Sequence, residues 1–122
     1  MNIKEYLQKA FRLNVMIDTY KQQLEQFRAL IDSVMPIIKN NSSLMTKTKA
    51  YEASIKTKID RCMHLKVEIQ NTIAAVEDDR DRHLLQKRYI ECKAWNVIAD
   101  EMYYSDQYIQ KLHQKILQKI SL

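Results

Sequence analysis

The chain of 122 residues contains no glycine and a single proline, Pro36. Tight β-hairpins and many turns depend on these two residue types, so their scarcity argues against a protein built from strands. The residues that recur instead are leucine, isoleucine, lysine, glutamine, glutamate and alanine, which favour helix. We therefore predict an all-α fold, with a length that suits one domain, or one small domain carried on an extended helical element.

Cysteine is also scarce. Cys62 and Cys92 lie thirty residues apart and belong to no Cys-x-x-Cys or Cys/His pattern. This spacing indicates neither a disulfide framework nor a zinc site. We expect both side chains to be small apolar packing residues in a reducing cytosol.

Long apolar runs are missing as well. No window approaches the ~20 apolar residues that a membrane-spanning helix needs. The N-terminal stretch MNIKEYLQKAF carries charges at Lys4 and Glu5 and lacks the apolar run of a leader. We expect a soluble, cytoplasmic protein without a membrane partner.

Signs of catalysis are absent from the sequence. It has no glycine-rich phosphate loop and no nucleophile with an evident base. Its one acidic cluster is EDDRDR, at residues 77–82. A metal site there is the weaker interpretation, because Asp78 or Asp79 can cap a helix and Asp81 suits its first turn. We expect no enzyme, no cofactor and no metal.

The positive charge is concentrated towards the C-terminus. The whole chain has a net charge of +5, and residues 80–122 hold 8 basic and 5 acidic residues. This excess is modest for a dedicated nucleic-acid binder, but it makes the C-terminal third the part that would face an anion.

Two heptad patterns occupy the N-terminal part. Apolar residues follow each other at spacings of three and four from Ile3 to Val34 and again from Ile55 to Val76, with Lys66 as the one polar interruption. Pro36 and the polar residues after it predict a helix break and a loop near 39–46. We predict an antiparallel helical hairpin over residues 1–78, which serves for dimerisation or partner binding.

Some apolar residues lie beside these stripes and need cover of their own. They can be buried by dimerisation into a four-helix arrangement or by packing against the C-terminal domain. The residues concerned are Leu7, Phe11, Leu30, Met63 and Leu65.

Three short helical patterns follow, at residues 80–91, 94–103 and 106–120. The connection between the last two consists only of Tyr103, at the end of one pattern, and of Tyr104 and Ser105, so these helices must cross steeply, as in a helix-turn-helix. Ser105 is placed to cap the last helix. The apolar residues of the three patterns predict a small core in a domain over 79–122: Leu84, Leu85, Tyr89, Trp95, Ile98, Ala99, Met102, Ile109, Leu112 and Ile116.

The run LLQKRYIECKAWNVIADEMYYSDQYIQKLHQKIL resembles the helix-turn-helix of the last region of bacterial sigma factors. With the N-terminal heptads included, the chain is similar to small phage proteins of the ArpU type, proposed regulators of late-gene transcription. The resemblance implies a sequence-specific binder of duplex DNA, encoded by a phage or prophage and acting in the cytoplasm of a bacterial host cell. One position departs from the family pattern: Tyr103 stands where a glycine is usual, and positive φ is costly for tyrosine.

The last helix has an outward face near its N-terminal end, which would enter a major groove first. Glutamine can pair with adenine and lysine with guanine, so we expect base contacts from Gln107, Gln110, Lys111 and Gln114. His113, next to Leu112, is expected at the rim of the core or against a phosphate. Expected phosphate contacts are Ser105, Lys87, Arg88, Lys93, Lys115 and Lys119.

The sequence is therefore compatible with two functions from different classes. The first is a transcriptional regulator whose hairpin dimerises it or contacts RNA polymerase. The alternative is a coiled-coil interaction protein that binds RNA polymerase or another host protein without reading DNA. The modest charge and the acidic Asp106 at the groove-entering end favour the alternative.

Overall fold

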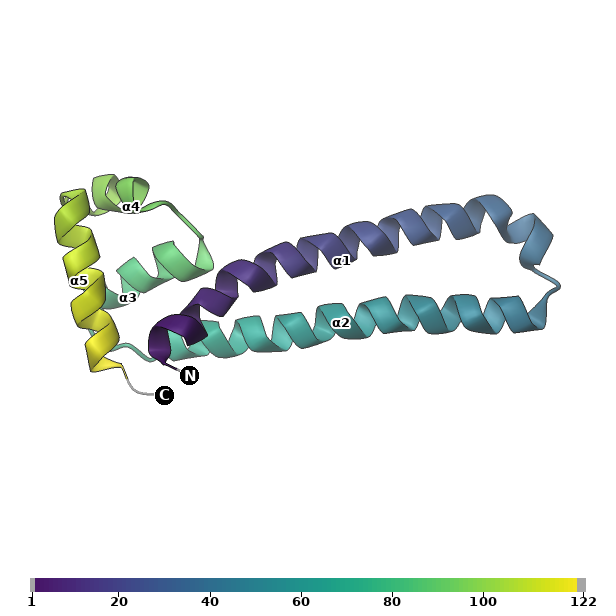
Figure 1. The fold of residues 1–122 in the computed structure, drawn as a ribbon, viewed down its shortest axis with the longest axis horizontal. Coiled ribbons are helices and arrows are strands. Elements are labelled where there is room, and N and C mark those ends of the chain that lie inside the picture. The colour runs from purple at the N-terminus through teal and green to yellow at the C-terminus, as the bar shows by residue number, and fades with distance from the viewer. Residues whose placement is uncertain (1, 121–122) are drawn as a thin grey trace. The chain divides into compact units, whose positions relative to one another are not determined.

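A computed structural model describes residues 2–120, and every regular element in this part of the chain is a helix, which confirms the all-α prediction. Figure 1 shows the ribbon. The elements are α1 (Ile3–Ile38), α2 (Ser42–Ala74), α3 (Asp79–Leu85), a π-helical turn η1 (Gln86–Ile90), α4 (Trp95–Met102) and α5 (Asp106–Lys119).

The helices form two compact units. One comprises Leu13–Leu65, and the other combines Met1–Arg12 with Lys66–Leu122. The units do not follow the predicted division between residues 78 and 79. The physical reason is that the first turns of α1 carry apolar side chains that pack with the C-terminal helices: Leu7 is buried, and the Phe11 ring lies 5.5 Å from that of Tyr89.

Within the unit Leu13–Leu65, α1 and α2 run antiparallel, and three contacts define their register. Lys58 Nζ lies 5.7 Å from the ring centre of Tyr20, the rings of Phe27 and Tyr51 are 4.5 Å apart, and Arg28 Nη2 lies 3.0 Å from Glu52 Oε1. From the Tyr20–Lys58 contact to the Phe27–Tyr51 contact, the residue number rises on α1 and falls on α2, as an antiparallel pair requires.

The connection between α1 and α2 is shorter than predicted. Only residues 39–41 separate the helices, and Asn41 caps α2 by accepting a hydrogen bond from Leu44 N at 3.0 Å. Pro36 does not break the helix where expected, since α1 continues to Ile38. Pro36 lacks the N–H that would bond to the carbonyl four residues earlier, and the helix ends two residues after it.

Two helices bury only one stripe each, so part of the apolar surface of this unit stays uncovered. Leu13, Ile55 and Cys62 are buried, while most of the remaining stripe is half-buried. Of the side chains expected to need cover, Leu7 is buried and Phe11 is half-buried, whereas three others remain exposed: Leu30, Met63 and Leu65.

The C-terminal helices begin at the cap that the acidic cluster predicts. Asp78 accepts a hydrogen bond from Asp81 N at 3.0 Å and starts α3. The helix then widens into η1, where Glu91 N donates to Gln86 O at 2.9 Å, and it ends at Cys92, whose φ is 56°. Cys92 is exposed, so the expectation of a packing role is wrong for Cys92 and confirmed for the buried Cys62. Cys92 lies beyond the last turn of η1, in the left-handed conformation that commonly ends a helix, and therefore outside the apolar stripe of that helix.

The turn between α4 and α5 is as short as predicted. Tyr104 N donates to Ala99 O at 2.9 Å, and Ser105 starts α5 by accepting from Tyr108 N at 3.1 Å. Tyr103 adopts φ 62° and ψ 41°, the left-handed conformation that a glycine would take without strain. The ribbon shows α4 and α5 crossing steeply within this unit (Figure 1).

Replacing Tyr103 by glycine is expected to stabilise the protein by about 1 kcal/mol, because a β-carbon is unfavourable in the left-handed region. The tyrosine side chain is 93% exposed, so little packing is lost. Urea unfolding measures the change. Tyr103→Ala is the matched control, since it removes the ring and keeps the strained β-carbon. Equal stabilities of the two variants would contradict the assignment of strain.

Candidate nucleic-acid interface

The candidate interface lies on α5, whose two faces differ sharply in character. Ile109, Leu112 and Ile116 are buried, as predicted, and hold the helix against α3 and α4. The residues expected to contact bases point away from this core, and all four are exposed: Gln107, Gln110, Lys111 and Gln114. A helix fixed by its apolar stripe and by the Ser105 cap presents these side chains on a rigid support.

Two of these residues also face the start of the chain. Gln110 and Gln114 line a small polar cleft of about 180 Å³ together with Lys4 and Gln8 of α1 and with Arg88. All of them belong to the same compact unit. This role of α1 was not predicted, because a heptad pattern indicates a helix partner and not which of its turns meets a distant segment.

Lys87 and Lys93, both expected on phosphates, share a carboxylate. Lys87 Nζ donates to Glu101 Oε2 at 2.7 Å, and Lys93 Nζ donates to Glu101 Oε1 at 2.6 Å. The hydrogen bonds from Lys87 and then Lys93 lower the pKa of Glu101, and the bond to Glu101 raises the pKa of Lys93. Both lysines are thus already paired with a carboxylate, which reduces their attraction for a phosphate.

Arg88 is built into the fold. Its guanidinium carbon lies 4.3 Å from the ring centre of Trp95 and 5.0 Å from that of Phe11, and Nη1 donates to Lys93 O at 2.9 Å. Trp95, expected in the core, is half-buried, with this cation against its ring. Arg88 also borders the cleft, with Lys4 and Gln110.

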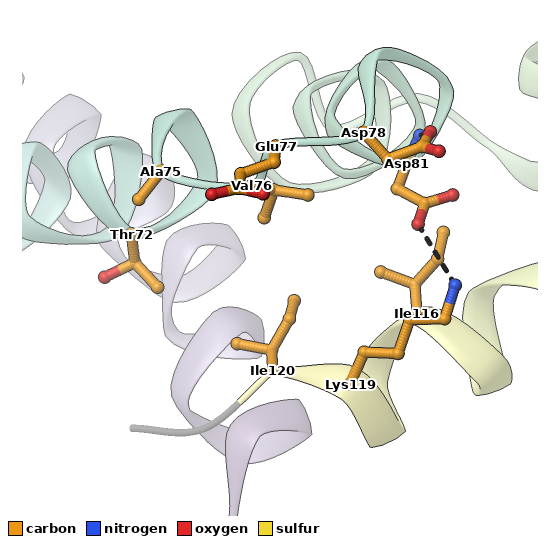
Figure 2. Close-up of a pocket in the computed structure, with 9 residues that line it drawn as sticks. All are labelled: Thr72, Ala75, Val76, Glu77, Asp78, Asp81, Ile116, Lys119 and Ile120. Carbon is orange, nitrogen blue, oxygen red and sulfur yellow. Dashed lines mark hydrogen bonds and ion pairs between the residues drawn. The ribbon is translucent and has the colours of Figure 1, made fainter.

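Lys119 lies on the opposite side of α5 from this cleft. Its Nζ is 3.6 Å from Asp81 Oδ2, and Arg80 also reaches Asp81, whose side chain is buried. Figure 2 shows the ion pair between Lys119 and Asp81 at the edge of an open groove. The groove has a volume of about 630 Å³ and is lined mainly by the end of α2, the segment before α3 and the end of α5. Lys115 and Ser105, the other expected phosphate contacts, are exposed.

His113 is not at the rim of the core. The side chain is buried, and its Nε2 lies 2.7 Å from the Tyr89 hydroxyl. Burial, followed by the charges of Lys4 and Arg88, lowers the pKa of His113 to about 4, and burial raises the pKa of Tyr89 to about 12. Both groups are therefore neutral near pH 7, and a buried neutral imidazole cannot serve as a phosphate contact.

Exposed tyrosines near the turn were missed by the sequence analysis. The rings of Tyr104 and Tyr108 are 4.8 Å apart, and both side chains are exposed beside the start of α5. Tyr103 and Tyr104 lie between two helical patterns and belong to no apolar stripe. An aromatic residue in such a position is not directed into the core, and this could have predicted its exposure.

Comparison of the chain with models of protein families, with curated proteins and with solved structures finds no match. Among residues 2–120, no helix is long and apolar enough to cross a membrane. The same residues contain no group of three or more His, Cys, Asp or Glu side chains placed to hold a metal ion.

The buried His113 predicts a pH dependence of stability. Its pKa is about 4 in the folded protein against an ordinary 6.5, so between these values the unfolded chain takes up the proton and folding weakens. The contribution is complete above pH 6.5 and is lost as the pH falls towards 4, with a size of about 3 kcal/mol. Urea unfolding at several pH values measures it.

His113→Gln removes this titration and keeps a polar group for the Tyr89 hydroxyl, so its stability should depend less on pH in that window. His64→Gln is the matched control, because the His64 side chain is 77% exposed. An unchanged pH dependence in His113→Gln, relative to the parent protein, would show that His113 does not cause it.

Proposed function

We propose that the protein is a phage or prophage transcriptional regulator that binds duplex DNA sequence-specifically through α5. The observation that carries the proposal is the outward face of α5, where Gln107, Gln110, Lys111 and Gln114 are exposed on a helix that a short turn joins to α4. The resemblance to the last region of sigma factors and to ArpU-type proteins supports both the reading helix and the phage origin.

The chemistry of this face suits the major groove. A glutamine amide can donate to adenine N7 and accept from N6, while a lysine ammonium can donate to guanine O6 and N7. Gln107, Lys111 and Gln114 succeed each other at helical spacings of four and three, so they form one row along the outward side. Such a row can follow neighbouring base pairs as the helix lies in the groove.

The N-terminal hairpin supplies the second half of the proposal. Leu30, Met63 and Leu65 are exposed apolar side chains in the unit Leu13–Leu65. They support association of two copies or contact with RNA polymerase, because burial of such side chains stabilises an interface. A symmetric dimer would read two half-sites related by a two-fold axis.

The direct test is to incubate the protein with sheared phage and bacterial DNA at ~150 mM salt, where specific complexes outlast non-specific ones, and to sequence what is retained. We expect one enriched motif. Simultaneous replacement of Gln110, Lys111 and Gln114 by alanine should abolish the enrichment. The matched control replaces Lys21, Gln22 and Gln26, which are equally exposed on α1.

The outcomes separate the two functional classes. Enrichment that survives in the α5 variant would contradict the assignment of the reading face. Absence of retained DNA at any salt concentration would remove the regulator proposal. It would favour the alternative, a coiled-coil protein that binds RNA polymerase or another host protein. The pairing of Lys87 and Lys93 with Glu101 also supports this alternative, because it leaves less free positive charge for DNA.

Glu101 also provides a test of the proposed phosphate contacts. Glu101→Gln releases Lys87 and Lys93 from their carboxylate, so duplex DNA should bind several-fold tighter and the salt dependence should steepen by up to about 2 in log–log slope. Fluorescence anisotropy with a labelled duplex at several salt concentrations measures both. Glu25→Gln changes the net charge equally at an exposed position in the other unit and should alter neither. A slope unchanged by Glu101→Gln would remove these two lysines from the interface.

A further inference from the structure

The first turns of α1 belong to the same compact unit as α5, and they place a cation beside the proposed reading face. Lys4 and Gln8 lie one helical turn apart on α1 and line the polar cleft with Gln110 and Gln114. The Phe11 ring anchors this side of α1 to η1 by packing on Tyr89 and Arg88. The position of Lys4 next to α5 is therefore fixed by a packed contact and not by a flexible tail.

The cleft is cationic. Lys4 and Arg88 both border it. Burial lowers the pKa of His113 most, and the charges of Lys4 and Arg88 lower it further, so both cations disfavour a positive charge on this side chain. The other polar groups of the cleft are the neutral amides of Gln8, Gln110 and Gln114 and the side chains of Tyr89, Trp95 and His113. None of the described residues that line this cleft is a carboxylate; Glu5, on the same stretch of α1, lines a neighbouring cleft with Lys9 and Arg12, and Gln8 lines both.

Lys4 is available for an outside partner. Its side chain is exposed, and among residues 2–120 no ion pair engages it. This distinguishes it from Lys87 and Lys93, which pair with Glu101, and from Lys119, which pairs with Asp81. A cation with amide donors around it is a suitable environment for one phosphate group.

We infer that the cleft between α1 and α5, with Lys4 as its free cation, binds a backbone phosphate at the edge of the groove that α5 reads. The inference rests on the proposed function and extends it, because it makes the first turns of the N-terminal helix part of the DNA interface. A phosphate held there would fix the depth and register of α5, so that Gln110 and Gln114 meet the adjacent bases.

The test compares Lys4→Gln with Lys21→Gln on the enriched duplex, by anisotropy at several salt concentrations. Both variants change the net charge equally, but Lys21 lies in the other unit. Loss of one phosphate contact should reduce the log–log salt slope by ~0.9 and leave the enriched motif unchanged. Lys21→Gln should match the parent protein.

A second measurement locates the phosphate. Duplexes that carry one neutral methylphosphonate at successive positions flanking the motif should lose affinity for the parent protein at one position, and Lys4→Gln should be insensitive there. Equal slopes and equal methylphosphonate profiles for Lys4→Gln and the parent protein would overturn this inference while leaving the reading helix intact. A parent protein that retains no DNA would overturn both proposals together.

Discussion

A buried hydrogen bond of 2.7 Å between the Tyr89 hydroxyl and His113 Nε2 ties α5 to η1 beside the apolar stripe that faces inward. Tyr89 lies in η1 and His113 in α5, so the bond joins elements separated by a whole helix and a turn. Each group alone would be costly to bury, and each satisfies the other. With this side of α5 fixed beside the apolar stripe, helical periodicity sends Gln107 and Lys111 to the opposite side.

The guanidinium of Arg88 extends this constraint to the N-terminus. It lies against the rings of Trp95 of α4 and Phe11 of α1, so the distant start of the chain meets η1 and α4 at one cation. The consequence is that the first turns of α1 are structurally part of the C-terminal unit. A truncation designed from the heptad pattern would remove residues that support the proposed interface.

Much of the local structure could be predicted from the sequence. Caps such as Asp78 and Ser105 have short-range causes, and so does the buried stripe of Ile109, Leu112 and Ile116. Long-range features could not be predicted. The pairing of Lys87 and Lys93 with Glu101 depends on how η1 and α4 meet, and the burial of His113 depends on Tyr89, which lies 24 residues away. Periodicity shows that a residue faces inward or outward, but not which neighbour it meets.

The central claim is that the outward face of α5 contacts DNA, and amide chemical-shift mapping tests it most directly. A ¹⁵N-labelled protein would be titrated with a duplex that carries the enriched motif. The account predicts that the largest shifts fall on residues 105–114 and on the first turns of α1, while residues 13–65 stay nearly unchanged. Shifts confined to residues 13–65, or none at duplex concentrations that saturate the anisotropy signal, would contradict it.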